Sequence, residues 1–279
     1  MTIKISTYVS LILMISLFVT GIGCRNYAGV EWVVDYSKVG KPNVPCRKDC
    51  AEGFYNTIIQ HPDWVGHFNV GNANAWEKHF KRKSKGGIDD NWIDAVDIAY
   101  FAGHGAGAGT KPTGVGTGGG FTFGVDKNDD WVLSAAPFNR EPRWGDKDLE
   151  WIVLDICSPL ALKSDGAGYA LSKRWMNSDV MRGLHYILGF RTVAHDNCHR
   201  GRIFAEYLTG KRDGKNYTIR EAWRKATEDT EWSEVQGAYL RAYSPGCNTY
   251  NDHLHEYGPV SADPEPACQC YCYSSWSCL

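Results

Sequence analysis

Short apolar runs alternate along the chain with longer segments of helical periodicity. The apolar runs predict β-strands at residues 28–37, 64–70, 95–103, 151–156, 184–192 and 239–245. Helical patterns lie at residues 50–60, 72–83, 169–175, 202–210 and 218–230. Alternation of strand and helix predicts an α/β fold with a mainly parallel central sheet and helices on both of its faces.

Local signals sharpen three of these elements. Asp49 is a candidate N-cap for the helix at 50–60, and Thr218 with Glu221 three residues later forms a capping-box pattern. The strand at 95–103 carries apolar or aromatic residues at both alternating sets of positions. This pattern is typical of a strand that is buried on both faces.

Two of the predicted strands end in residues that carry chemistry. The strand at 95–103 leads to His104 and Gly105, and the strand at 151–156 leads to Cys157. Sites in parallel sheets lie at the carboxyl ends of the strands, so neighbouring strands would bring these residues together. The pattern predicts Cys157 as a nucleophile and His104 as its base, with a following helix dipole favouring the thiolate. The N–H groups of Gly105 and Cys157 would form an oxyanion hole.

The stretches "IAYFAGHG" and "WIVLDIC" resemble the paired motifs of the caspase-like cysteine peptidases, which include metacaspases, legumain and gingipain. The resemblance implies a caspase-like three-layer α/β sandwich over about residues 28–259, a His104–Cys157 dyad and no cofactor. It also implies that Asp155 lines a pocket for a basic P1 side chain of the substrate. The chain departs from the metacaspase pattern after the nucleophile, where it reads Cys157-Ser158-Pro159-Leu160. His195 and Asp196 would lie at the cleft rim, in contact with a protein or peptide substrate.

The N-terminal segment has the pattern of an export signal. Lys4 precedes an apolar run over residues 8–22, and small residues lead to Cys24. Three outcomes stay open: lipidation of Cys24, cleavage without a lipid, and a retained membrane anchor. We therefore expect residues 1–24 to be a signal or anchor, and the protein to be secreted or tethered at the cell surface.

Export changes the interpretation of the ten cysteines. Without Cys24 and Cys157 eight remain, and an oxidising compartment favours structural disulfides, with Cys198 paired to Cys247 or another partner. Residues 25–262 are predicted to form the catalytic domain, and residues 263–279 a proline-containing linker and cysteine-rich tail. The formal net charge of −2 gives no basic footprint for nucleic acid.

Two alternatives to a peptidase follow from the same residues. In the first, the fold is caspase-like but the dyad is inert, and the protein is a surface binding protein. In the second, the chain binds a metal ion through histidine and cysteine side chains, although it contains no H-E-x-x-H motif. The candidate ligands in that case are His195, Cys198, His199, His253 and His255, with Asp196 or Glu256.

Overall fold

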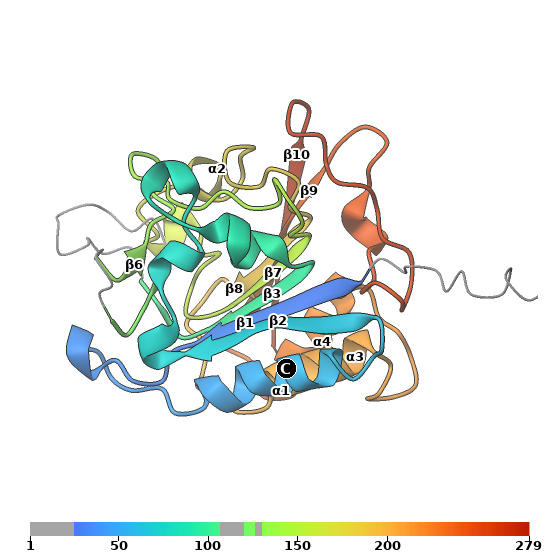
Figure 1. Cartoon of the computed structure of the whole chain (residues 1–279), viewed down its shortest axis with the longest axis horizontal. Helices are drawn as coiled ribbons and strands as arrows, with labels where there is room; N and C mark the ends of the chain where they lie inside the picture. Colours follow the sequence, from blue (N-terminus) through green and yellow to red (C-terminus); the bar gives the residue numbers. More distant parts are fainter. Residues whose placement is uncertain (1–24, 107–119, 126–129, 279) are drawn as a thin grey trace, which may run out of the picture.

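The computed structural model describes residues 25–106, 120–125 and 130–278, which form a mixed α/β structure around a seven-stranded, mostly parallel sheet (Figure 1). The strand order is β10-β9-β8-β7-β3-β1-β2; β2, β1, β3, β7 and β8 run parallel, and β9 and β10 are antiparallel to their neighbours. The strands are β1 (Asn26–Trp32), β2 (Trp64–Gly71), β3 (Ile98–Ala102), β7 (Trp151–Asp155), β8 (Tyr186–Phe190), β9 (Gln236–Tyr243) and β10 (Cys270–Ser277).

One face of the sheet is covered by the longer helices, which lie below it in Figure 1. These are α1 (Arg47–Ile58), α3 (Arg200–Leu208) and α4 (Ile219–Thr230). Phe54 of α1 stacks against Tyr100 of β3, with ring centroids 5.0 Å apart, and against Phe204 of α3 at 5.8 Å. Burial of these rings fixes α1 and α3 under the centre of the sheet.

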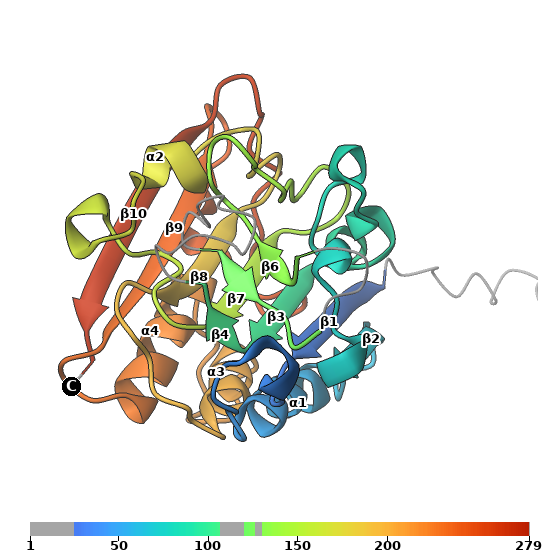
Figure 2. The ribbon, with the colours of Figure 1, turned by 90° about the vertical axis from the view of Figure 1, so that its left-hand side faces the viewer.

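The other face is covered by loops, 3-10 turns, one short α-helix and a small antiparallel sheet, so helices lie on both faces as predicted, but the long helices are confined to one of them. That small sheet is formed by β4 (His104–Gly105), β5 (Phe121–Thr122) and β6 (Val132–Leu133), and it lies at the carboxyl ends of β3 and β7 (Figure 2). The α-helix assigned to this layer, α2, is the single turn Leu171–Arg174. The 3-10 turns among the described residues are Ser37–Val39, Asn72–Asn74, Glu77–His79, Lys83–Lys85, Asp89–Asn91, Ile93–Ala95, Lys163–Asp165 and Thr249–Asn251.

The helix predicted at residues 72–83 is wrong, because three of those 3-10 turns take its place. Asn72 has a φ of 50°, and its side chain accepts hydrogen bonds from the N–H groups of Val34 (2.8 Å) and Asp35 (3.0 Å). His79 hydrogen-bonds to the buried Glu31 of β1 at 2.6 Å. These tertiary contacts compete with helix hydrogen bonding, which sequence periodicity alone does not reveal.

The remaining predicted strands and long helices are confirmed, with shifts of a few residues at their ends. The capping box is confirmed as well, because the Thr218 side chain accepts from the N–H of Glu221 at the start of α4. Asp49 is not an N-cap, since α1 already begins at Arg47 with Cys46 at the cap position.

The C-terminal segment belongs to the central sheet. Residues from Cys270 to Ser277 pair antiparallel with β9, as far as Gln236, and form the edge strand β10. The prediction that residues 263–279 form a linker and a tail outside the domain is therefore wrong for this strand. Its composition is unusual for a strand, since serines and cysteines alternate with aromatic residues.

One disulfide joins Cys46 to Cys198, and the other cysteines of the described ranges, Cys50, Cys157, Cys247, Cys268, Cys270, Cys272 and Cys278, are free thiols. The expectation that eight cysteines form disulfides is thus wrong for most of them, and Cys247 is not the partner of Cys198. Within the described residues, the helices are too short or too polar to cross a bilayer. The export segment and Cys24 lie outside the described residues.

Candidate active site

The two predicted catalytic segments are in backbone contact at the carboxyl ends of β3 and β7. These strands are paired in parallel, with Ala102 opposite Asp155, and the N–H of Gly103 continues the ladder to the carbonyl of Asp155 at 3.3 Å. A Cβ atom built on Gly105 would overlap the carbonyl oxygen of Cys157 and would lie 3.4 Å from its Cα atom. Glycine at position 105 therefore permits the close approach of the two segments.

The register of the small sheet directs the Gly105 amide away from β5. The N–H of Ala106 donates to the carbonyl of Gly120 at 2.7 Å, and Gly105 lies opposite Phe121. Hydrogen-bonded and non-hydrogen-bonded pairs alternate in an antiparallel ladder, so Gly105 occupies a non-hydrogen-bonded position. Its N–H is thus free of the ladder and points outward from β5.

Hydrogen bonds hold the His104 imidazole and backbone in place. Nε2 of His104 lies 2.8 Å from the carbonyl oxygen of Pro42, and its ring packs edge-on against Tyr36 with centroids 4.6 Å apart. The Tyr36 hydroxyl accepts from the N–H of His104 at 2.8 Å and donates to the carbonyl of Thr122 at 3.0 Å. Because a carbonyl oxygen can only accept, Nε2 carries the proton in the neutral ring and Nδ1 has the free lone pair.

The surroundings of His104 favour the neutral imidazole. Partial burial lowers the pKa of His104, and the nearby positive charges of Lys41 and Arg47 lower it further, while the bond to Pro42 opposes them. At neutral pH the ring is therefore unprotonated at Nδ1, which is the form that a general base requires.

Cys157 lies on a tight turn that directly follows β7. Its Sγ is 3.6 Å from the carbonyl oxygen of Ala194, in the loop after β8, and its side chain is partly exposed. Ser158 has a φ of 58°, and its N–H donates to the carbonyl of Thr192 at 2.9 Å. The helix predicted after the nucleophile, at residues 169–175, is present only as the single turn α2, which begins at Leu171 and does not directly follow Cys157. A helix dipole therefore does not act on Cys157 from that side.

Asp155 does not line an open pocket. The residue is fully buried, and its carboxylate is paired with Arg47 (2.9 Å) and Arg200 (2.5 Å). The Tyr100 hydroxyl and the Cys50 thiol donate to its other oxygen at 2.8 and 3.2 Å. Burial alone would raise the pKa of Asp155, but Arg200 and Arg47 outweigh this effect and hold it below the ordinary value. The prediction that Asp155 contacts a basic substrate side chain is therefore wrong. Its carboxylate instead forms internal ion pairs with Arg47 and Arg200.

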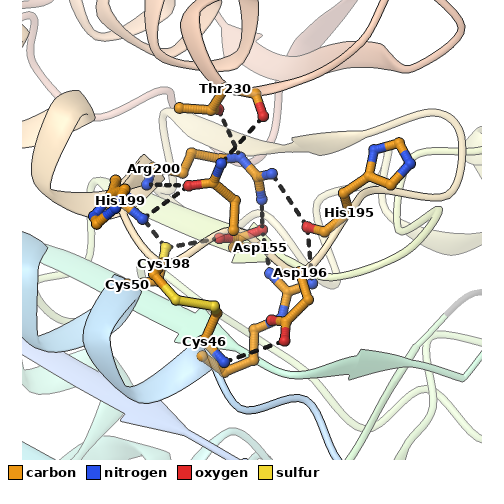
Figure 3. The surroundings of a disulfide bond; sticks show 12 residues. Cys46, Cys50, Asp155, His195, Asp196, Cys198, His199, Arg200 and Thr230 are labelled. Atoms are coloured by element: carbon orange, nitrogen blue, oxygen red, sulfur yellow. Dashed lines mark hydrogen bonds and ion pairs between the residues drawn. A yellow bond between two sulfur atoms is a disulfide. The ribbon is translucent and has the colours of Figure 1, made fainter.

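His195 and Asp196 lie on the loop that the Cys46–Cys198 disulfide ties to the start of α1 (Figure 3). Nδ1 of His195 is bonded to the buried Glu231 at 2.7 Å, and 43% of its side chain is exposed. Asp196 is paired with Nε of Arg47 at 3.2 Å and is 25% exposed. Solvent thus reaches both side chains, as expected for residues at a rim, and the His195 ring points away from the disulfide (Figure 3).

The metal ligands suggested by the sequence are not brought together. Cys198 is in a disulfide, and His199 is exposed at the start of α3. His255 lies instead beside Asp97 and Glu150, which precede β3 and β7 and are thus at the opposite end of the sheet from Cys157. Among the described residues, His255, Asp97 and Glu150 form a cluster of three side chains that can bind metal, with one ligand atom from each within 4.8 Å of the others.

Sequence reasoning missed the residues that support the dyad. Tyr36 and Pro42 follow β1, about 60 residues before His104, and no motif marks them. Arg47 and Glu231 pair with the predicted site residues Asp155 and His195 from distant helices or their ends. In the sequence, Arg47 next to Cys46 is only a weak signal of an internal ion pair. Its burial and its partner Asp155 are known only once the fold is known.

Comparison with curated proteins gave no match. A protein-family comparison matched residues 30–277, which include β10 as well as both predicted catalytic segments. The chain therefore belongs to the family described as a domain of unknown function, DUF6345.

Proposed function

We propose that this protein is a cysteine endopeptidase of caspase-like fold, with Cys157 as nucleophile and His104 as general base. The observation that carries the proposal is the backbone contact between Gly105 and Cys157 at the ends of two adjacent parallel strands. The contact brings the Cys157 turn against the His104–Gly105 segment, and the side chains of His104 and Cys157 are both partly exposed, which supports the proposal. Chain order and strand context also agree with the resemblance to caspase-like peptidases.

The geometry supports acyl transfer in two steps. Nδ1 of His104 removes the thiol proton, and the thiolate of Cys157 attacks the carbonyl carbon of the peptide bond. The N–H groups of Gly105 and Cys157 donate to the resulting oxyanion. Collapse breaks the C–N bond as His104 protonates the leaving amine, which leaves a thioester on Cys157. A water molecule, deprotonated by His104, then hydrolyses the thioester and restores the thiol.

The preference for a basic P1 residue needs a different carboxylate from the one first considered. Asp155 is buried against two arginines, whereas Asp196 is partly exposed near the dyad, where its negative charge partly offsets the lowering of the His104 pKa. Asp196 is therefore the acidic side chain that a lysine or arginine of the substrate would meet. Its existing bond to Arg47 reduces its free charge, so we expect a modest preference.

We also propose that the protein is exported and held at the cell surface by its N-terminal segment. The charged start, apolar run and Cys24 support a lipoprotein signal. The Cys46–Cys198 disulfide supports an oxidising compartment. Intact mass of the membrane fraction tests this: lipidation predicts loss of the first 23 residues and addition of acyl chains, which Cys24→Ser abolishes. A soluble protein of unprocessed mass would refute it.

Covalent labelling tests the peptidase proposal. Acyloxymethyl-ketone peptides with Arg, Asp or Leu at P1 are added to wild type, Cys157→Ala, His104→Ala and the control Cys268→Ala. We expect wild type and Cys268→Ala to be labelled at Cys157, His104→Ala to be labelled much more slowly, and Cys157→Ala to stay unlabelled. Failure of every probe to label wild type would contradict the proposal and favour an inert binding protein of the same fold.

A further inference from the structure

Three side chains with metal-binding chemistry converge at the end of the sheet opposite to Cys157. Asp97 directly precedes β3, Glu150 directly precedes β7, and His255 lies in the loop after the 3-10 turn Thr249–Asn251. That loop lies at the right of Figure 1, where the parallel strands begin. One ligand atom from each residue lies within 4.8 Å of the others, although the residues are far apart in the sequence.

The distances between these atoms fit a shared ion. Nε2 of His255 is 3.5 Å from Oδ1 of Asp97 and 3.2 Å from Oε1 of Glu150. Ligands bound to one first-row ion at about 2.0–2.2 Å are separated by roughly 2.8–3.6 Å along an octahedral or tetrahedral edge. Both carboxylate oxygens thus already lie at about this separation from Nε2 of His255.

The two carboxylates are oriented toward the imidazole. The N–H of Tyr27 donates to Oδ2 of Asp97 at 2.5 Å, which leaves Oδ1 facing His255. Oε2 of Glu150 is inaccessible to solvent and has no hydrogen-bond partner among the described residues. A buried carboxylate oxygen without a partner is costly, and a bound cation would remove that cost.

The carboxyl groups of Asp97 and Glu150 both face the single imidazole of His255. Among the described residues, neither carboxyl group forms an ion pair with a lysine or arginine. The neighbouring His185 is already paired with Asp252 at 2.7 Å and Asp263 at 3.3 Å.

We propose that Asp97, Glu150 and His255 bind one divalent first-row metal ion such as Zn²⁺ or Mn²⁺. Three protein ligands leave further coordination positions for water, as in metal sites that are open to solvent. The ion would supply the missing positive charge and join the loop at His255 to the starts of β3 and β7. This site is separate from the Cys157 site, and its function does not depend on the proposed peptidase activity.

Mn²⁺ is the sharper probe, because thiols bind it weakly and the free cysteines would otherwise compete for Zn²⁺. Binding to the full-length protein is measured by the loss of the free Mn²⁺ EPR signal. We expect one site in wild type and at least about tenfold weaker binding in His255→Gln and Glu150→Gln, since even outer partners of metal ligands contribute 10–100-fold. His253→Gln, two residues away in the same loop, is the matched control and should bind as wild type does.

Thermal unfolding is an independent measurement that distinguishes loss of metal binding from misfolding of a variant. Mn²⁺ or Zn²⁺ should raise the Tm of wild type and His253→Gln but not that of Glu150→Gln. Without metal, Glu150→Gln should be as stable as wild type or more stable, because it removes a buried carboxyl that has an unpaired oxygen. Equal Mn²⁺ affinity in all four proteins, or wild-type binding of both ions weaker than about 1 mM, would overturn the proposal.

Discussion

The carbonyl oxygen of Cys157 occupies the position that a side chain at Gly105 would need. This contact joins the segment that follows β3 to the turn that follows β7. It explains why a glycine follows His104: a larger residue would push the imidazole segment away from the nucleophile turn. The relationship gives the account its first test.

Gly105→Ala should separate the two segments. The added methyl group meets backbone rather than a flexible side chain, so we expect a loss of about 1–3 kcal/mol of stability and at least a hundredfold loss of kcat/KM. Gly214→Ala is the control, because a Cβ there meets nothing within 4 Å, and any cost at that position comes from its positive φ of 79°, which Gly105 does not share. Denaturant unfolding and peptide hydrolysis measure the two effects. Full activity in Gly105→Ala would show that the contact does not matter for catalysis.

Tyr36 is a positioning residue for His104. Tyr36→Phe removes a hydroxyl that bonds both the His104 N–H and the Thr122 carbonyl, and it leaves two buried polar groups unpaired. We expect a cost of about 1–3 kcal/mol and a fall in kcat with little change in KM. Tyr217→Phe, which removes an exposed hydroxyl bonded to Asp213, is the matched control. A change in KM alone would instead indicate that Tyr36 binds substrate.

Asp155 is predicted to act on stability rather than on substrate binding. Asp155→Asn leaves Arg47 and Arg200 buried without their shared carboxylate, which should cost about 3–5 kcal/mol. Asp165→Asn, in the partly exposed pair with Arg191, should cost less than about 1 kcal/mol. Because the pKa of Asp155 is lowered in the folded state, its contribution is present above about pH 3.9 and is lost as the pH falls through the folded value. If the Asp155→Asn variant were as stable as wild type but had an altered P1 preference, the result would show that Asp155 lines the P1 pocket after all.

The fall of kcat/KM at acidic pH should reflect protonation of the His104 imidazole. Its pKa is lowered by burial, Lys41 and Arg47, so the neutral base persists below the ordinary histidine value of about 6.5. We expect the midpoint of the fall in kcat/KM to lie below pH 6.5. Lys41→Gln removes one of the positive charges and should move the midpoint upward. A midpoint above pH 7 would contradict the assigned environment of His104.

The sequence predicted the central part of the sheet because those strands are buried on both faces. Tyr100 and Val153 pack in one core cluster and Phe101 and Leu154 in the other, so both alternating sets of positions are apolar or aromatic and the pattern is visible without tertiary information. The chain order of His104-Gly105 and Cys157, together with the rule for strand ends, was sufficient to predict that the two segments lie side by side. This inference needed only that β3 and β7 be neighbours, which they are.

The errors share one physical cause, which is dependence on distant partners. Asn72 bonds to the chain after β1 and prevents a helix, and the pairing partner that makes β10 a strand lies in β9. The sequence pattern predicts Asp155 as a pocket residue, because its ion pairs with Arg47 and Arg200 are visible only in the folded structure. The pairing of Cys46 with Cys198 across 152 residues likewise has no local signature.

The most direct test of the central claim is the alkylation rate of Cys157 by iodoacetamide at pH 6.5, which needs no knowledge of the substrate. Peptide mass spectrometry compares Cys157 with the exposed Cys268 in the same molecule, for wild type and His104→Gln. An imidazole that accepts the thiol proton predicts Cys157 to react at least about tenfold faster than Cys268 in wild type, and predicts loss of that advantage in His104→Gln. Equal rates at Cys157 in the two proteins would contradict the dyad.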